Sequence, residues 1–396
     1  MIQTAKRIQA VEEYYFSRKL AEVRSLDTPE HRVINLGIGS PDMAPAPSAI
    51  NALIESANNP ANHGYQNYKG IPQLRKGIAD FYKRIYNVTL DAENMILPLM
   101  GSKEGIMHIA MAFVNEGDEI LIPDPGYPTY SSVANLVGGK IKTYALKEEL
   151  KWGIDVDALR KTDLSKVKIM WVNFPHMPTG RIASTDELKE LVDLARTNNF
   201  LIVNDNPYSL ILNDEPLSIL SVPGAEDVAL ELNSLSKSHN MAGWRIGWVA
   251  GKKEYIDAVL KVKSNMDSGM FLGLQHAAVE ALQSSDEWFS DLNKIYIERR
   301  AAAHKILDVL GCTYESKQSG LFVWAKAPET ISNVETFIDE ILYGTKVFIT
   351  PGFIFGEAGR RYIRISLCSP VEKIKEACDR IEKFVHTKTK LQTEKA

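Results

Sequence analysis

The stretch Asn-Ser-Leu-Ser-Lys-Ser-His-Asn-Met-Ala-Gly-Trp-Arg-Ile-Gly, residues 233–247, decides how the rest of the chain is interpreted. Its one lysine, Lys237, lies among hydroxyl side chains, and Arg245 follows eight positions later. A lysine amine that can lose its proton forms Schiff bases with carbonyl compounds, and serine hydroxyls with an arginine fork can hold a phosphate. This combination fits the cofactor pyridoxal phosphate. A surface lysine with an unrelated arginine is the alternative, so the rest of the chain must supply the context.

Composition narrows the classes of function. The 396 residues are 45% apolar and 24% charged, an ordinary globular balance, and the length favours two domains over one. The net charge is −4 and no basic run stands out, so we expect neither nucleic acid nor an anionic membrane surface as a partner. Three cysteines without C-x-x-C spacing predict a reduced, cytoplasmic protein. We expect no signal peptide, because no apolar segment follows the first residues, and no membrane-spanning helix, because no apolar run is long enough.

Five apolar segments predict the strands of a mainly parallel sheet with helices on both faces, an α/β fold. Ligands in such sheets bind beyond the carboxyl ends of the strands. Each segment is followed by polar residues, which we expect to meet at one rim, although a single one of them could equally be a turn residue or a helix cap. The segments are 95–100, 119–123, 168–173, 200–204 and 228–232, and the polar residues are Ser102, Tyr127, Asn173, Asp205 and Lys237.

The two ends of the chain predict a second unit. After a long helical run over 255–310, short strands and helices indicate a smaller α+β domain. We expect a large domain over 46–290 and a small one from 1–45 and 291–396, with the first residues as an arm. Its predicted elements are helices over 4–26, 331–342 and 370–386, strands over 33–36, 320–325, 347–350 and 362–367, and a frayed polar end over 387–396.

Several motifs, in this order along the chain, resemble those of the class I and II aminotransferases, which are fold-type I pyridoxal-phosphate enzymes. The resemblance runs from about Val33 to Arg364. Its short sequence motifs look most like those of the branch with alanine, aspartate-type and LL-diaminopimelate aminotransferases. It implies a homodimer that moves the amino group of an L-α-amino acid to a 2-oxo acid in a ping-pong cycle. The motifs are the Tyr65–Gly70 loop, Gly101-Ser102-Lys103, the N-x-P-x-x-P-T-G turn at 173–180, Asp205-x-x-Tyr208, the lysine–arginine stretch and Arg364.

The resemblance also implies a role for each site residue. Lys237 would carry the cofactor and move a proton, Asp205 would keep the pyridine nitrogen protonated, and Tyr208 would bond the phenolic oxygen. Arg364 would fork onto the substrate α-carboxylate beside the Gly39 backbone, although an arginine alternating with isoleucines could also face solvent. Further cofactor contacts are implied for Tyr127, which would stack on the ring, for Asn173, for Ser102, Lys103, Ser234, Ser236 and Arg245 around the phosphate, and for Tyr65, which would reach the phosphate of the neighbouring subunit. No metal ligand is expected.

One position departs from the family pattern. Met177 stands where the family usually has an asparagine that donates hydrogen bonds to the cofactor and the substrate carboxylate. A thioether cannot donate. Either Asn173, His176 or a water replaces that donor, or the grip on the substrate differs from the family norm.

Alternatives to transamination stay open at this stage. A β-lyase that eliminates a thiol would use the same cofactor for a different reaction. An aminotransferase-like regulatory domain would catalyse no reaction. The short segment before the first fold motif argues against the regulator, which usually carries an N-terminal helix-turn-helix domain. Residues 264–271 are expected to border the site of the neighbouring subunit, and Tyr14–Phe16 to cover it. Neither segment decides among alanine, aspartate, glutamate, aromatic donors and LL-diaminopimelate.

Overall fold

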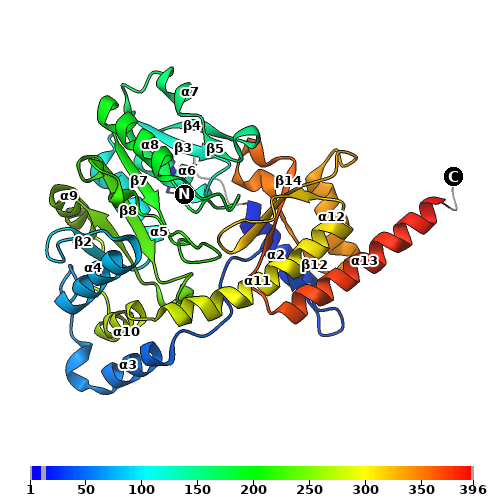
Figure 1. Ribbon diagram of the computed structural model, residues 1–396, viewed down its shortest axis with the longest axis horizontal. Helices are drawn as coiled ribbons and strands as arrows, with labels where there is room; N and C mark the ends of the chain where they lie inside the picture. The colour runs from blue at the N-terminus through cyan, green and yellow to red at the C-terminus, as the bar shows by residue number, and fades with distance from the viewer. Residues whose placement is uncertain (1, 10–14, 394–396) are drawn as a thin grey trace.

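The computed structural model describes residues 2–9 and 15–393, which form a larger and a smaller group of β-strands, each packed against helices (Figure 1). These two groups with their helices are called the larger and the smaller layer. The larger is an eight-stranded sheet with the strand order β2-β9-β8-β7-β6-β3-β4-β5. Its strands are β2 (Ile96–Leu99), β3 (Glu119–Asp124), β4 (Lys140–Lys147), β5 (Gly153–Ile154), β6 (Val167–Val172), β7 (Leu201–Asp205), β8 (Ala229–Ser234) and β9 (Gly247–Gly251).

The five predicted strands all run in one direction, so the expected mainly parallel α/β sheet is confirmed. The sheet has three further strands that the sequence analysis did not identify. The strand β9 lies antiparallel between β2 and β8, β4 runs parallel beside β3, and β5 closes the edge antiparallel to β4. The carboxyl ends of the five predicted strands therefore share one edge, where the polar residues gather.

Helices cover both faces of this sheet, because its strands are buried on both sides. Along β6, Ile169 and Trp171 join the core under α5, α6 and α9, whereas Met170 and Val172 join the core on the opposite face, where α8 packs. Helices α4 and α10 cover the β2–β9 end of that second face. The helices are α3 (Pro47–Asn58), α4 (Pro72–Tyr86), α5 (Ser102–Phe113), α6 (Pro128–Val137), α7 (Val156–Arg160), α8 (Thr185–Asn198), α9 (Lys253–Lys263) and α10 (Leu272–Leu282).

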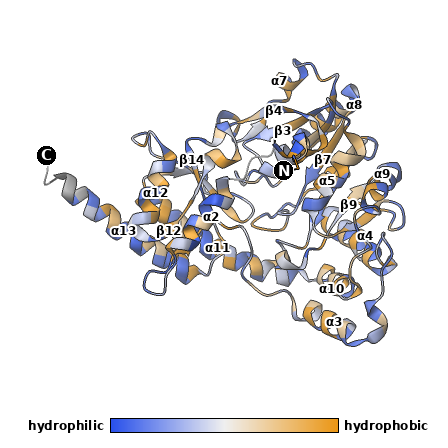
Figure 2. Ribbon diagram, turned by 180° about the vertical axis from the view of Figure 1, so that it is seen from behind, coloured by the Kyte–Doolittle hydropathy of each residue, from blue (hydrophilic) through white to orange (hydrophobic). Residues whose placement is uncertain are grey.

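The smaller layer contains a four-stranded antiparallel sheet of order β10-β11-β14-β13 and a parallel pair, β1 with β12. The helices around it carry hydrophobic and hydrophilic residues on different sides (Figure 2). None of the described helices is long and apolar enough to cross a membrane. The elements are α1 (Lys6–Gln9), α2 (Tyr15–Leu26), β1 (Ile34–Asn35), α11 (Asp286–Val309), β10 (Thr313–Tyr314), β11 (Phe322–Lys326), α12 (Val334–Thr345), β12 (Val347–Phe348), β13 (Thr350–Pro351), η6 (Gly352–Phe355), β14 (Tyr362–Ser366) and α13 (Val371–Thr393).

Three predicted helices differ from the structure. The run over 255–310 is divided into α9, α10 and α11, because Gly269 adopts a left-handed φ of 87° and the Ser285 hydroxyl caps the start of α11. The end over 387–393 is helical rather than frayed, and residues 394–396 lie outside the described residues. The first predicted helix appears as α1 and α2, with residues 10–14 outside the described part of the chain.

Candidate active site

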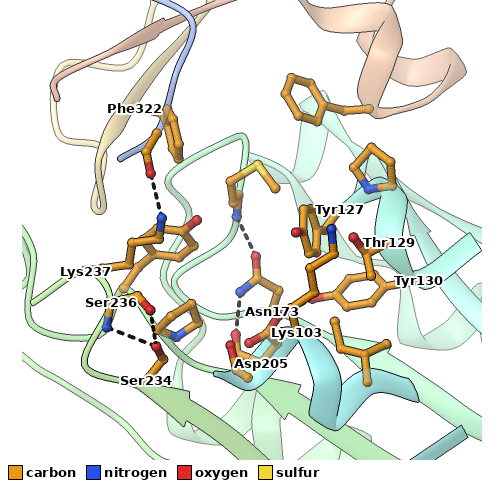
Figure 3. A pocket seen from close by; sticks show the side chains of 18 of the residues that line it. Lys103, Tyr127, Thr129, Tyr130, Asn173, Asp205, Ser234, Ser236, Lys237 and Phe322 are labelled. Atoms are coloured by element: carbon orange, nitrogen blue, oxygen red, sulfur yellow. Dashed lines mark hydrogen bonds between the residues drawn. The ribbon is translucent and has the colours of Figure 1, made fainter. Parts of the chain in front are cut away.

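A cavity of about 710 Å³ lies between the carboxyl edge of the large sheet and the smaller layer (Figure 3). Every site residue predicted from the sequence lines it except Tyr65, whose side chain is 93% exposed and lies outside it. The residues brought together are Gly39, Ser102, Lys103, Tyr127, Asn173, Asp205, Tyr208, Ser234, Ser236, Lys237, Arg245 and Arg364.

Lys237 follows β8 and extends into the cavity. Its Nζ donates a hydrogen bond of 2.6 Å to the carbonyl of Gly39, almost 200 residues earlier in the chain. Burial lowers the pKa of the Lys237 amine, and the nearby positive charges of Arg364 and Arg245 act in the same direction. A neutral amine is the nucleophilic form of lysine, so the cavity makes this side chain more reactive than a surface lysine.

Asp205 is the last residue of β7 and is buried. One carboxylate oxygen, Oδ2, accepts a 2.9 Å hydrogen bond from the Tyr130 hydroxyl, while Oδ1 is buried without a partner among the described residues. Burial raises the pKa of Asp205 to about 6, and the Tyr130 hydrogen bond and the charge of Lys237 oppose that rise. Because buried polar atoms are almost always paired, the open oxygen marks a place for a ligand that donates.

Tyr130 was not among the predicted site residues. Its ring lies parallel to that of Trp171, with centroids 5.1 Å apart, and perpendicular to that of Tyr127 at 5.6 Å. These contacts fix the direction of the Tyr130 hydroxyl toward Asp205. The Tyr208 phenol lies close by, and burial raises its pKa well above the usual range. At neutral pH both phenols therefore stay protonated and can donate.

A second group of residues forms a cradle at the start of α5. Gly101 precedes this helix with a φ of 92°, and no side chain caps the helix, so its first N–H groups are available to an anion. A Cβ on Gly101 would overlap the Arg245 guanidinium, and one on Gly247 would lie 2.7 Å from the Ser102 nitrogen. Glycine is thus required at both positions, because Arg245 and the α5 N-terminus approach so closely.

The two serines of the opening stretch contact each other at the edge of this cradle. The Ser234 hydroxyl lies 2.7 Å from the Ser236 hydroxyl and 3.1 Å from the Ile246 carbonyl. Arg245 itself adopts a left-handed φ of 58°, which is uncommon for a residue other than glycine. This strained conformation at the cradle is typical of a residue whose orientation is set by function.

Arg364 lies on the other side of the cavity, buried in β14. Its guanidinium carbon lies over the rings of Phe322 and Phe355, at 3.9 and 4.6 Å from the centroids. One nitrogen, Nη2, donates to the Gly37 carbonyl at 2.8 Å, and Nε is buried without a partner among the described residues. Burial lowers the pKa of Arg364 to about 10, so the group remains charged at neutral pH and can receive an anion.

Met177 faces this arginine. Its sulfur lies 3.3 Å from Arg364 Nη1, and its backbone N–H donates to the Asn173 side chain at 2.8 Å. Asn173 in turn donates to the Asp205 carbonyl, so both ends of its amide already have backbone partners. His176 is not among the described residues that line the cavity, and burial lowers its pKa to about 3. The structure does not bring His176 into the position of the missing donor.

The open groups can be matched to a single ligand. Asp205 Oδ1 needs a donor, the cradle at α5 fits a phosphate, and the Lys237 amine can attack a carbonyl. The ring nitrogen, phosphate and aldehyde of pyridoxal phosphate supply these three groups, so the residues present fit this cofactor.

Comparison with known proteins agrees with this chemistry. The family described as aminotransferase class I and II matches residues 31–381. The LL-diaminopimelate aminotransferase of Aquifex aeolicus is 39% identical over 384 residues, which cover 96% of this chain and 99% of that protein. Among solved structures, substrate-bound BacF from Bacillus subtilis superposes with a TM-score of 0.92 at 34% identity, covering 97% of this chain and 98% of that one. An aromatic aminotransferase from Pyrococcus horikoshii superposes with a TM-score of 0.85 at 28% identity, covering 93% and 99%.

These matches extend over nearly the whole chain and over nearly the full length of the relatives. Together with the geometry of the cavity, they show that this chain belongs to the class I and II aminotransferases, pyridoxal-phosphate-dependent enzymes that move the amino group of an L-α-amino acid to a 2-oxo acid.

Proposed function

We propose that the cavity around Lys237 is the catalytic centre of this aminotransferase. The observation that carries the proposal is the presence of three groups in one cavity: a lysine amine with a lowered pKa, a carboxylate with an open oxygen and a buried guanidinium with an open nitrogen. The bound pyridoxal phosphate supplies a carbonyl for Schiff-base formation and a ring that accepts electron density. Asp205 would hold the proton on the ring nitrogen, and the phosphate would occupy the cradle of α5, Ser234, Ser236 and Arg245.

Lys237 is proposed as the proton carrier of the reaction. Its lowered pKa makes the free amine available to take the proton from Cα of the amino donor and to pass it to the C4′ carbon of the cofactor. The Tyr208 hydroxyl, protonated at neutral pH, would donate a hydrogen bond to the phenolic oxygen of the cofactor, and Tyr127 would cover one face of the ring. Arg364, packed against the rings of Phe322 and Phe355, would bind the α-carboxylate by its fork, next to the backbone of Gly39.

We also propose a homodimer in which each catalytic centre needs both subunits. Tyr65 is the predicted site residue that lies outside the cavity of its own chain, and its ring is almost fully exposed. A partner subunit would bring a second Tyr65 to the phosphate. Mixing inactive Lys237→Ala and Tyr65→Ala subunits tests this arrangement, since one site of each mixed dimer would contain both native residues. Recovery of up to about a quarter of native activity is expected, and no recovery contradicts a shared site.

The predicted domain division and compartment remain proposals. The strands of the large sheet all lie between residues 96 and 251 and those of the small antiparallel sheet between 313 and 366, which supports a large unit over 46–290 and a small one from 1–45 and 291–396. The three cysteines are free thiols, two of them buried, which supports a reducing cytoplasmic location.

Several relatives are named LL-diaminopimelate aminotransferases, which makes LL-diaminopimelate one candidate donor for this chain. A visible absorption spectrum tests the proposal and the donor together. We expect the purified holoenzyme to show an absorbance band that an amino donor bleaches and a 2-oxo acid restores. Bleaching without restoration, with pyruvate released, would instead indicate a β-lyase. A Lys237→Ala protein that cycles at the native rate would contradict the proposed centre.

A further inference from the structure

We propose that Asp42 and Arg299 are positioning residues for amino transfer, because their ion pair fixes a segment that holds Arg364 and Lys237 at a set distance from each other. This segment, residues 36–42, is called the strap, and it follows β1 of the smaller layer directly. The inference rests on the proposed function, in which Arg364 binds the substrate α-carboxylate and Lys237 moves the α-proton.

Backbone carbonyls of the strap bind the two side chains that the proposed function uses most. The Gly37 carbonyl accepts a hydrogen bond of 2.8 Å from Arg364 Nη2. Two residues later, the Gly39 carbonyl accepts one of 2.6 Å from Lys237 Nζ. Arg364 belongs to β14 of the smaller layer, whereas Lys237 follows β8 of the larger one. The strap therefore links the two sides of the cavity through its backbone.

Ser366 attaches the strap to β14, two residues after the arginine. Its backbone N–H donates to the Leu36 carbonyl at 2.7 Å, and its hydroxyl donates to the Ile38 carbonyl at 2.7 Å. All carbonyls of residues 36–39 thus accept a hydrogen bond from β14 or from the lysine. A segment held at each successive peptide group has little freedom to shift alone.

The two glycines of the strap allow it to lie directly against aromatic rings. A Cβ on Gly37 would be 2.5 Å from the Phe348 ring, and one on Gly39 would be 2.3 Å from the Phe322 ring. The Phe322 ring is also one of the two that contact the Arg364 guanidinium. The position of the strap backbone and the position of this arginine therefore depend on each other.

Arg299 fixes the far end of the strap from α11, the helix that extends from the larger to the smaller layer (Figure 1). Its Nη1 and Nη2 lie 2.6 and 3.0 Å from the two carboxylate oxygens of Asp42, a bidentate pair. Nη1 also donates to the Leu367 carbonyl, directly after β14, at 3.0 Å. The arginine side chain is 5% exposed, so water hardly competes for these bonds. One guanidinium thus keeps the strap and the end of β14 together.

The separation between Arg364 and Lys237 decides whether a proton can be transferred. With the α-carboxylate on the arginine, the proton on Cα must come within reach of the lysine amine. A shift of the strap by about 1 Å would change this separation, and a misplacement of that size can lower a rate by about a hundredfold. The contacts that fix the strap all lie within one chain, so they are the same whichever residues a partner subunit adds to the cavity.

The first test removes the fork of Arg299 but keeps its charge. The half-reaction of the holoenzyme is followed by stopped-flow absorbance, with whichever of L-glutamate, L-alanine, L-aspartate and LL-diaminopimelate bleaches the native protein fastest. In Arg299→Lys, we expect KM for this donor to rise and kcat to fall, so that kcat/KM falls by about tenfold. Arg300→Lys is the matched control, since Arg300 is the next residue of α11 and donates to the Gln318 carbonyl, outside the cavity.

Thermal unfolding of both variants separates positioning from a purely structural role. A purely structural ion pair would change the amount of folded enzyme, and hence the apparent kcat, but would leave KM unchanged. A lower unfolding temperature of Arg299→Lys with native KM therefore overturns the inference, and so does an equal rise of KM in Arg300→Lys. A native holoenzyme that none of the four donors bleaches contradicts the proposed function itself, and the inference with it.

The second test acts on the strap without a change of charge. Ser366→Ala removes the hydroxyl that donates to the Ile38 carbonyl, while the ion pair at the end of the strap stays intact. We expect kcat/KM to fall by about threefold through a higher KM for the donor. Ser221→Ala is the control, because its hydroxyl donates to the Ser218 carbonyl at 2.7 Å outside the cavity. A native KM in Ser366→Ala overturns the inference even if Arg299→Lys does not fold.

Discussion

The two sides of the cavity are built from different chemistry. On the large-sheet side, polar groups bind each other: Asp205 accepts from Tyr130, Asn173 donates to the Asp205 backbone, and Ser234 contacts Ser236. On the small-sheet side, the charged Arg364 is surrounded by phenyl rings, a thioether and one carbonyl. The proposed function assigns amino transfer to the polar side and the binding of the substrate α-carboxylate to the apolar side.

The strongest test of this division is Lys237→Ala on the polar side. Loss of the proton carrier is expected to lower kcat by about 10⁴-fold while the protein still binds pyridoxal phosphate noncovalently. The rate of the half-reaction with L-alanine and the loss of the protein-linked absorbance band measure this effect. Lys253→Ala is the control, because that lysine is exposed and pairs with Asp257 on α9. A residual rate within tenfold of native would assign the chemistry elsewhere.

Asp205→Asn is expected to give the next largest effect and to separate function from stability. Burial raises the Asp205 pKa from 3.8 to about 6, so the charged carboxylate destabilises the folded, cofactor-free protein above pH 6, and this penalty vanishes below pH 3.8. The rise of the Asp205 pKa from 3.8 to about 6 corresponds to a loss of at most about 3 kcal/mol in the free energy of unfolding above pH 6.

The asparagine variant without cofactor should therefore be more stable than the native chain at pH 8, with a gain that shrinks toward pH 4, although its amino transfer is slower. Urea unfolding at both pH values measures the free energies. Equal stability of the two proteins at pH 8 would mean that the carboxylate is not strained in the cofactor-free state.

Tyr130→Phe tests whether the polar side depends on its hydrogen bonds. Removing the donor to Asp205 should raise the Asp205 pKa further, move the acidic limb of the pH–rate profile upward and lower kcat/KM by about tenfold. The control is Tyr144→Phe, which removes a comparable buried hydrogen bond to the Trp171 carbonyl outside the cavity. If both variants have the same pH profile, Tyr130 has only a packing role.

Met177→Asn is expected to have the smallest effect on the kinetics. It makes the apolar side more like the polar side. An amide beside Arg364 would add a donor to the apolar side, and we expect the KM for the amino donor to fall by about threefold. Met177→Leu should leave KM unchanged, because neither thioether nor isobutyl group can donate. Identical steady-state kinetics in the asparagine variant would show that the departure at this position has no consequence.

Most of the large sheet could be predicted because its central strands are buried on both faces and appear as continuous apolar runs. The strand β9 was missed because Gly247–Gly251 is only five residues long, begins and ends with glycine, and starts two residues after Arg245. The strand β4 was missed because Lys140–Lys147 has lysines on its exposed positions and lies near the sheet edge. Of the two, β9 pairs with the distant strand β2, whereas β4 pairs with its neighbours in the chain, β3 and β5.

The residues that line the cavity were predicted where one residue has its own chemical signature, and were missed where two residues act as a pair. Lys237, Asp205 and Arg364 stand at motif positions, and all three line the cavity. Tyr130 lies one helical turn after the predicted Tyr127, but its partner Asp205 is 75 residues away. The rings that enclose Arg364 come from two separate elements, β11 and η6. No local pattern reports such long-range neighbours.

The packing of Arg364 against two rings also bears on handedness. A buried guanidinium in contact with two rings is restricted in turning toward a misplaced carboxylate, and a hydrogen bond to the Gly39 carbonyl orients the Lys237 amine. If Arg364 holds the α-carboxylate and Lys237 takes the α-proton, as proposed, the Cα–H bond must point to Lys237 while the carboxylate stays at Arg364. In the mirror-image donor held by the same two groups, the side chain and the amino group exchange places, so the amino group no longer faces the cofactor. Discrimination between mirror images would thus follow from three fixed positions: those of Arg364, Lys237 and the cofactor.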